Sequence, residues 1–247
     1  KEYGTQAKYY LGFMAYEGDN YKEATKYFDE VSGDDKYKEK LSYYQADMNF
    51  KGGNFQKAID LGIKAMAKSS PAEKSELNKI IGESYFNLKQ YDKAIPYLTQ
   101  YKGKKGKWSN TDFYQLGYAY YTQNDFENAI SQFNKIIGGK DAVAQNAYYH
   151  LGESYLKTDK KQQALNAFKN ASEMQFDLKL QEDASYNYAK LSYEIGNSFQ
   201  SVPDVLSGFL TKYPNSPNKI EIESLLIDSF ITSKNYKGAL ELLEKNK

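Results

Sequence analysis

Residues 116–133 read LGYAYYTQNDFENAISQF, and this stretch decides the fold. It sets small Gly117 and Ala129 among large apolar residues. Alanine returns at the position of Ala129 along most of the chain, in steps of 34, 36, 35 and 35 residues, at Ala24, Ala58, Ala94, Ala129 and Ala164. A fixed period in this range is typical of stacked helix pairs rather than of one globular core. The sequence therefore predicts a protein that acts through a surface rather than through a catalytic site.

Three further copies keep the same template of paired small and large residues. They are Leu11-Gly12/Tyr21/Ala24/Phe28, Ile81-Gly82/Tyr85/Tyr91/Ala94/Leu98 and Leu151-Gly152/Tyr155/Ala164/Phe168. This pattern resembles the tetratricopeptide repeat (TPR). The resemblance implies an all-α fold of tandem helix-turn-helix repeats, stacked as about seven helix pairs into a right-handed α-solenoid, and it implies protein or peptide binding as the function.

Some copies depart from the template. The second has Gln45-Ala46 in place of the leucine-glycine pair, and the fifth has Lys161 in place of the aromatic residue before the alanine. The sixth needs an extra residue near Ser198 and has Val202 where alanine is expected, while the seventh has Ile227 at the first small position and regains alanine at Ala239. The register of these last copies is therefore less well defined than that of the others.

We predict one continuous array over residues 1–247, because each repeat of a solenoid contacts only its neighbours. The repeats are expected near 5–36, 37–70, 71–108, 109–140, 141–178, 179–215 and 216–247. The first helices are expected at Thr5–Glu17, Tyr37–Lys51, Pro71–Leu88, Asn110–Thr122, Ala142–Lys157, Gln181–Ile195 and Pro217–Ser233. The second helices are expected to begin near Tyr21, Phe55, Tyr91, Phe126, Lys160, Phe199 and Tyr236.

Helix-capping residues support these boundaries. Ser70 and Glu73 flank Pro71 with capping-box spacing, and Ser109 with Asp112 repeats that spacing. Pro214 and Pro217 are expected to close one repeat and open the next, because proline can begin a helix but cannot continue one. The glycine pairs Gly52-Gly53 and Gly138-Gly139 fit left-handed helix terminators better than a phosphate-binding loop.

The residue types needed for common catalytic sites are scarce. The chain has no cysteine and a single histidine, His150, which lies inside a first helix between Tyr149 and Leu151. A multi-histidine metal site or a histidine-based nucleophile relay cannot be built from this set. We therefore predict no enzymatic activity, no metal and no cofactor, with His150 in a packing or surface role.

Charge disfavours nucleic acid as a partner. The net charge is +1, and all 33 basic residues are lysine. Arginine is the side chain best suited to bidentate contact with phosphate and guanine. One basic run occurs, at residues 102–107, and a solvated loop between repeats explains it; contact with a phosphate or a lipid headgroup is the alternative. Mean hydropathy is −0.78, and no apolar stretch reaches the roughly 18 residues of a membrane span.

The TPR resemblance also implies a binding surface, because five recurring positions of each first helix face the concave side in this family. Twelve of these positions are aromatic: Tyr9, Phe13, Tyr16, Tyr43, Phe50, Phe86, Tyr114, Tyr118, Tyr121, Tyr149, Tyr186 and Tyr193. Tyrosine offers a large contact area at low rotamer cost together with a hydroxyl group. The alternative is that some of these rings only pack. If Tyr114, Tyr118 and Tyr121 form a partner site, we expect their side chains to be exposed to solvent.

The charges at these positions define the expected partner. The predicted positions include nine acids and five lysines, so their net charge is −4. The acids are Glu17, Asp47, Glu76, Glu83, Glu153, Asp183, Glu194, Glu221 and Asp228, and the lysines are Lys40, Lys51, Lys79, Lys157 and Lys190. A protein or peptide segment with apolar or aromatic anchors and a slight positive charge would complement this face. Tyr9 and Phe13 stand where carboxylate-clamping members of the family need lysine and asparagine, so a receptor for chaperone tails is not expected.

Three functions remain open: a protein- or peptide-binding adaptor, a structural spacer or self-associating scaffold, and a glycan-binding module. The junction at residues 213–217 is similar to repeats in envelope TPR proteins of Gram-negative bacteria, such as the lipoprotein of the barrel-assembly machine and the Tol-Pal coordinator. This likeness implies a periplasmic or outer-membrane-facing location in an envelope-associated complex, with the cytoplasm as the alternative. The array starts without a leader and stops without a polar capping helix, so we expect a fragment of a longer protein.

Overall fold

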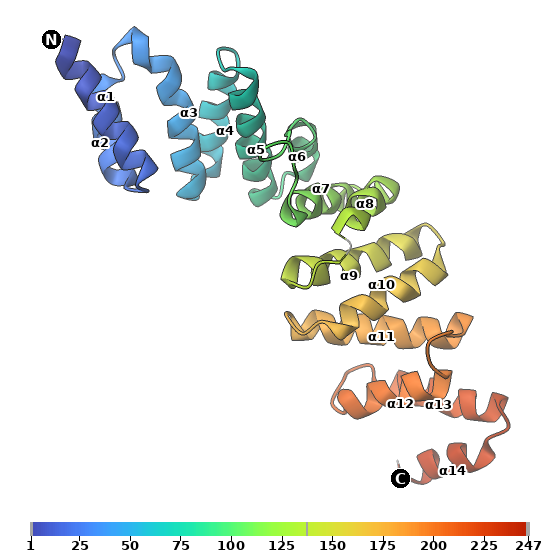
Figure 1. The fold of residues 1–247 in the computed structure, drawn as a ribbon. Helices are drawn as coiled ribbons and strands as arrows, with labels where there is room; N and C mark the ends of the chain where they lie inside the picture. The colour runs from blue at the N-terminus through green and yellow to red at the C-terminus, as the bar shows by residue number, and fades with distance from the viewer. Residues whose placement is uncertain (1, 137, 246–247) are drawn as a thin grey trace. The chain divides into compact units, whose positions relative to one another are not determined.

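The computed structural model describes residues 2–136 and 138–245. They form two compact units, residues 1–124 and 125–247, with the division inside the fourth repeat. The first unit contains α1 (Glu2–Glu17), α2 (Tyr21–Val31), α3 (Asp35–Lys51), α4 (Phe55–Met66), α5 (Pro71–Asn87), α6 (Tyr91–Leu98) and α7 (Asn110–Thr122) (Figure 1). The expectation of one continuous array stays a prediction.

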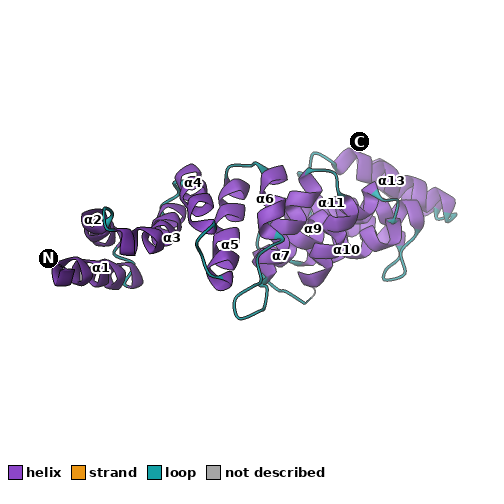
Figure 2. Cartoon of the chain, turned by 90° about the horizontal axis from the view of Figure 1, so that it is seen from above, coloured by secondary structure: helices purple, strands orange, loops and turns teal. Residues whose placement is uncertain are grey.

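The second unit also consists of helices. It contains α8 (Phe126–Phe133), the short 3-10 helix η1 (Asn134–Ile136), α9 (Ala142–Lys157), α10 (Lys161–Glu173), α11 (Leu178–Ile195), α12 (Val202–Lys212), α13 (Lys219–Thr232) and α14 (Tyr236–Lys245). Among the described residues no strand occurs, and loops join the helices throughout (Figure 2). The predicted all-α helical-repeat fold is confirmed.

Within each unit, every helix packs on its neighbours in the chain. Pairs such as α1–α2 and α9–α10 form hairpins, and each second helix also contacts the next first helix, as α4 contacts α5 and α10 contacts α11. Consecutive first helices touch as well, among them α3 with α5 and α11 with α13. The core is therefore a row of small inter-helix contacts rather than one central cluster, as expected for stacked repeats.

The predicted small residues lie at these contacts. The five repeat alanines Ala24, Ala58, Ala94, Ala129 and Ala164 are all fully buried. A Cβ atom added to Gly12 would lie 2.6 Å from the ring of Phe28, and one added to Gly152 would lie 2.8 Å from the ring of Phe168. Glycine is needed at these positions because the ring of a large residue on the second helix lies directly against the backbone of the glycine.

Capping follows the sequence closely. The side chains of Ser70 and Ser109 each accept a hydrogen bond from the backbone N–H three residues later. The carboxylates of Glu73 and Asp112 in turn accept a hydrogen bond from the N–H of Ser70 and of Ser109, so both capping boxes are complete. Gly53 and Gly138 have positive φ values of 77° and 85°, which confirms their role in turns.

The sixth repeat corrects the predicted register. Its second helix begins at Val202 rather than Phe199, so Val205, which is 6% exposed, takes the place that alanine has elsewhere. Val202, which the period assigns to that place, is only half-buried. The physical reason is that Ser201 caps α12 and Pro203 can be accommodated only in its first turn.

Other helix boundaries shift by a few residues. Helix α11 begins at Leu178 instead of Gln181 because Asp177 accepts a hydrogen bond from the Leu180 N–H and so caps the helix earlier. Pro217 does not open α13: residues 216–219 form a turn closed by the Lys219 N–H and the Ser216 carbonyl, and the helix begins at Lys219. The other predicted starts differ from the observed ones by no more than three residues.

Candidate functional site

The candidate site is the set of twelve aromatic side chains predicted on the first helices, which we call the tyrosine face. In unit 1 it is carried by α1, α3, α5 and α7, and in unit 2 by α9 and α11. Eleven of its members are at least partly accessible to solvent, and Tyr9 is the exception.

Tyr9 belongs to the core, which corrects its assignment to the binding surface. It is 7% exposed, stacks on Tyr37 with ring centroids 4.5 Å apart, and touches Phe28. Burial and a hydrogen bond with Tyr44 raise the pKa of Tyr9 to about 12. Because Tyr37 lies on α3 and Phe28 on α2, the Tyr9 ring fills the contact between the first and second repeats.

The stripe of Tyr114, Tyr118 and Tyr121 is half-buried, whereas a partner site there predicted that the three side chains are exposed to solvent. Tyr118 stacks with Tyr114 at 5.8 Å and with Tyr121 at 5.9 Å between ring centroids. It also contacts Phe86 of α5 and Tyr91 of α6. Rings spaced by three and four residues on one helix meet each other, so the same periodicity that aligns the stripe also covers part of it. Burial raises the pKa of Tyr114.

Tyrosine hydroxyl groups on the face are bonded to acids of the next repeat. Tyr16 donates to the Asp47 carboxylate at 2.5 Å, and Tyr186 donates to Glu221 at 2.7 Å. Tyr193 donates to Asp228 in the same way. In each case donor and acceptor lie 31 or 35 residues apart, which is one repeat. These bridges link consecutive first helices and occupy the hydroxyl groups of the three tyrosines.

Lysines neutralise several acids of the face. Lys51 forms an ion pair with Asp47 at 2.9 Å and lies over the rings of Tyr16 and Tyr21 at 5.3 and 5.4 Å. Lys190 bonds Glu221 at 3.0 Å. Within the described part of the chain, four predicted acids form no ion pair: Glu17, Glu76, Asp183 and Asp228. Lys161, which pairs with Glu194, is the one lysine from outside the predicted set that bonds an acid of the face within the described residues, so the face keeps a negative net charge.

The remaining members pack at their edges against neighbouring helices. Phe13 meets Tyr44 edge-on, and Phe50 tilts against Phe55. In unit 2, Tyr149 meets the buried ring of Phe168, and burial, followed by the charges of Glu153 and Asp183, raises its pKa to about 12. Their outer surfaces are therefore accessible while their edges are fixed. Tyr43 is also half-buried, and burial raises its pKa to about 12.

Tyr44 was missed by the sequence reasoning. Its ring contacts Phe13, Tyr16, Phe28 and Tyr43, so it organises the aromatic cluster of the first two repeats. The sequence pattern that could have identified Tyr44 is the pair Tyr43-Tyr44. Two neighbouring residues of a helix point in different directions, so one tyrosine must point inwards when the other lies on the face. Tyr91, which the template treated as a turn residue, also reaches the stripe through Tyr118.

A partly buried ionic cluster lies under the face in unit 1. Lys79 Nζ is 2.7 Å from Asp112 Oδ1 and 3.7 Å from Glu83 Oε1. Burial raises the pKa of Glu83. Burial also acts to raise the pKa of Asp112, but hydrogen bonds from Lys79 and Ser109 outweigh it and hold that pKa below its usual value.

We expect Asp112→Asn to lower the free energy of unfolding at neutral pH. A carboxyl group whose pKa is lower in the folded protein than in the unfolded chain stabilises the fold at pH values above its unfolded pKa, about 3.9. This contribution is lost as the pH falls through the folded pKa. The stability difference between the parent and Asp112→Asn should therefore be largest near neutral pH and narrow below about pH 4. Urea unfolding across a pH series measures it, and a difference that does not change with pH would contradict this role for the carboxylate.

The single histidine, His150, lies among packed side chains. His150 Nδ1 lies 3.0 Å from Glu153 Oε2, and its ring stacks on Phe133, which fits a packing role. The described residues contain no group of three or more histidine, cysteine, aspartate or glutamate side chains that could hold a metal ion. Within the same residues, no helix is long and apolar enough to cross a bilayer.

Paired helices, small residues at their contacts and a face of first-helix aromatics define a helical-repeat protein of the α-solenoid class. Sequence comparison agrees. A model of the tetratricopeptide repeat matches residues 80–102, and a model of anaphase-promoting complex, cyclosome, subunit 3 matches residues 101–171. No curated protein matches the chain at a significant level.

Solved structures show the same fold. MamA AMB-1 is similar with a TM-score of 0.60 and 18% identity, over 70% of this chain and 92% of that one. The C-terminal part of a TPR repeat-containing protein from Cytophaga hutchinsonii is similar with a TM-score of 0.59 and 14% identity, over 96% and 93%. The chain therefore has the fold of tetratricopeptide-repeat proteins, and its residues 80–102 match the model of that repeat. Its fold is of a kind that typically serves as a non-catalytic scaffold for protein–protein interaction.

Proposed function

We propose that this protein is a protein- or peptide-binding adaptor whose partner lies along the tyrosine face. The observation that carries the proposal is the stack of Tyr114, Tyr118 and Tyr121, which is half-buried and therefore both fixed in position and accessible at its outer surface. Rings held by their neighbours lose little conformational entropy when a ligand covers them. Rigid aromatic anchors of this kind are typical of interface hot spots.

The chemistry of the face limits the partner. Because tyrosine hydroxyl groups are bonded to acids of the next repeat, ring surfaces rather than hydroxyl groups are left for contact in Tyr16, Tyr186 and Tyr193. Apolar or aromatic anchors of an extended segment would fit those surfaces. Glu17 and Glu76 form no ion pair within the described residues, and they would favour a slight positive charge on the segment.

A matched pair of variants tests the proposal. Tyr114→Ala/Tyr121→Ala removes two anchors and leaves Tyr118, the most connected ring, in place. Tyr10→Ala/Tyr236→Ala removes two tyrosines that are 54% and 64% exposed and lie outside the face. In a pull-down from the source organism with identification by mass spectrometry, we expect the same proteins with the parent and the control and their loss with the face variant, since interface anchors each contribute about 2 kcal/mol or more.

Thermal melts of all three proteins accompany the pull-down, because the face rings also pack against one another. Equal capture by a folded face variant would reject the adaptor and favour a spacer. Binding that is competed by oligosaccharides but not by peptides would reject it in favour of glycan recognition. An envelope-associated location for the complex stays a prediction that rests on the junction at residues 213–217.

A further inference from the structure

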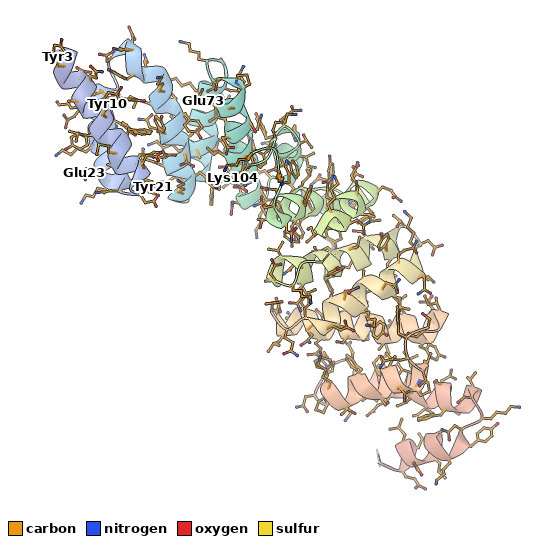
Figure 3. All side chains as sticks on the ribbon, in the orientation of Figure 1. Tyr3, Tyr10, Tyr21, Glu23, Glu73 and Lys104 are labelled. Carbon is orange, nitrogen blue, oxygen red and sulfur yellow. The ribbon has the colours of Figure 1, made fainter. Side chains whose placement is uncertain are left out.

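The link between α6 and α7 differs from the other links between repeats. It covers residues 99–109, whereas the links between α2 and α3, α4 and α5, α10 and α11, and α12 and α13 cover residues 32–34, 67–70, 174–177 and 213–218. The additional residues contain four exposed lysines, which we call the lysine turn: Lys102, Lys104, Lys105 and Lys107. Lys104 is labelled in Figure 3. The tyrosine face does not include this segment.

The lysine turn has a defined backbone. Lys104 and Lys107 form an isolated antiparallel bridge, and the Lys107 N–H donates to the Lys104 carbonyl at 3.1 Å. Gly103 and Gly106 have φ values of 83° and 76°, and a Cβ atom on Gly103 would lie 2.5 Å from the Lys107 backbone. The turn is therefore a closed structure that needs its glycines, and it does not have to be ordered by a partner.

Aromatic residues hold the base of the turn and leave its tip entirely polar. Tyr101 is buried and stacks on Trp108, whose Nε1 donates to the Tyr101 carbonyl at 3.0 Å. The Lys102 N–H donates to Ser75 Oγ at 2.9 Å. Beyond this base, residues 103–107 carry only glycine and lysine.

The four positive charges are not neutralised within the described residues. None of the four lysines forms an ion pair there, whereas Lys160 and Lys190 bridge to acids of neighbouring repeats. Lys79, at the base of the turn, pairs with Asp112 and Glu83. Burial raises the pKa of Tyr101 against the effect of Lys79, and the acids Glu76, Asp112 and Glu83 also act to raise it, so these acids lie near the base of the turn.

We propose that the lysine turn docks the protein on an anionic phospholipid surface. A short turn with ammonium groups on its exposed residues suits an extended layer of headgroups better than a single buried anion. Lysine is a strongly hydrated point charge that attracts a diffuse negative surface, while discrete phosphate recognition favours the bidentate arginine that this chain lacks. The aromatic residues stay at the base, so the contact is electrostatic and needs no insertion into the bilayer.

Vesicle co-sedimentation with the whole chain tests this proposal. We expect binding to vesicles of phosphatidylcholine and phosphatidylglycerol in equal parts, and none to phosphatidylcholine alone. Replacing all four lysines of the turn with glutamine should lower the partition coefficient roughly 10²–10³-fold, because each lysine near an anionic surface contributes about fivefold. Binding should also weaken as salt is raised.

A charge-matched control separates the turn from net charge. Lys22, Lys57, Lys140 and Lys234 are exposed, lie on separate segments and form no ion pair within the described residues. Their fourfold replacement with glutamine should leave most of the binding, and equal losses in both variants would overturn the proposal. The pair Lys104→Gln/Lys105→Gln should give an intermediate loss, with a melt that confirms folding.

The source of the negative charge is tested by competition. Soluble polyglutamate is added to the vesicle-bound protein. If it displaces the protein when the concentration of its carboxylate groups is still below that of phosphatidylglycerol, the proposal is overturned in favour of an acidic protein partner. Displacement by millimolar inorganic phosphate would overturn it in favour of a discrete phosphate site. Failure of vesicle binding while the tyrosine face still captures its partner would reject the lysine turn alone.

Discussion

Replacing Phe168 with alanine should lower the free energy of unfolding of unit 2 by about 3–5 kcal/mol, the cost of removing a buried aromatic ring and leaving a cavity. Phe168 is fully buried, meets Tyr149 edge-on at 5.8 Å and lies directly against the backbone of Gly152. The surrounding helices are held by their own neighbours and cannot easily collapse into the space. Urea unfolding followed by far-ultraviolet circular dichroism measures the change.

Two further variants show whether the ring and the glycine act as a pair. Gly152→Ala alone should destabilise by roughly 1–3 kcal/mol, because its Cβ would lie 2.8 Å from the Phe168 ring. In the Phe168→Ala background the same methyl group enters the cavity, so its cost should disappear or change sign. Strict additivity would contradict the packing. Phe176→Ala, at a ring that is 56% exposed, should change stability by no more than about 0.5 kcal/mol.

Gln145→Ala should destabilise unit 2 by about 3 kcal/mol, because it removes the hydrogen-bond partner of two part-buried backbone groups, the Met174 carbonyl and the Asp177 N–H. Gln145 is fully buried on α9. Its Nε2 donates to the carbonyl groups of Ala171, Met174 and Asp177 at 3.3, 2.8 and 3.2 Å, and its Oε1 accepts from the Asp177 N–H at 2.8 Å. One side chain therefore bonds backbone groups at both ends of the turn between α10 and α11.

The matched control is Gln175→Ala, in the same turn. Gln175 is exposed and its side chain forms no hydrogen bond within the described residues, so this change should cost no more than about 0.5 kcal/mol. Thermal melts and hydrogen exchange of the α10–α11 turn compare the two. If Gln145→Ala were no more damaging than Gln175→Ala, the hydrogen bonds of Gln145 would not hold the turn.

Predictability from sequence differs between the helices and the face. The periodicity of small residues determined the paired helices, since a glycine or alanine can only be required where two backbones approach each other. Buried Ala24 and Ala129 and the close contact at Gly152 follow from that one pattern. Local capping chemistry at Ser70 and Ser109 determined helix starts, because those hydrogen bonds lie within four residues of one another.

The sixth repeat marks the limit of the period. Its small position moved from Val202 to Val205, since the cap at Ser201 and the proline at 203 decided where α12 begins. A repeat period averages over copies, and a local helix start can override it. The earlier start of α11 at Leu178 has a similar local cause in Asp177.

By itself, the sequence determined the all-α repeat fold, most helix boundaries and the set of aromatic residues on first helices, because these depend on spacing along the chain. Only the tertiary structure decided which of those rings can meet a partner. Tyr9 is buried against Tyr37, and Tyr16 and Tyr186 donate to acids one repeat away. Such contacts depend on the rotation and separation of adjacent repeats, since side chains 31 to 35 residues apart meet only after the helices have stacked.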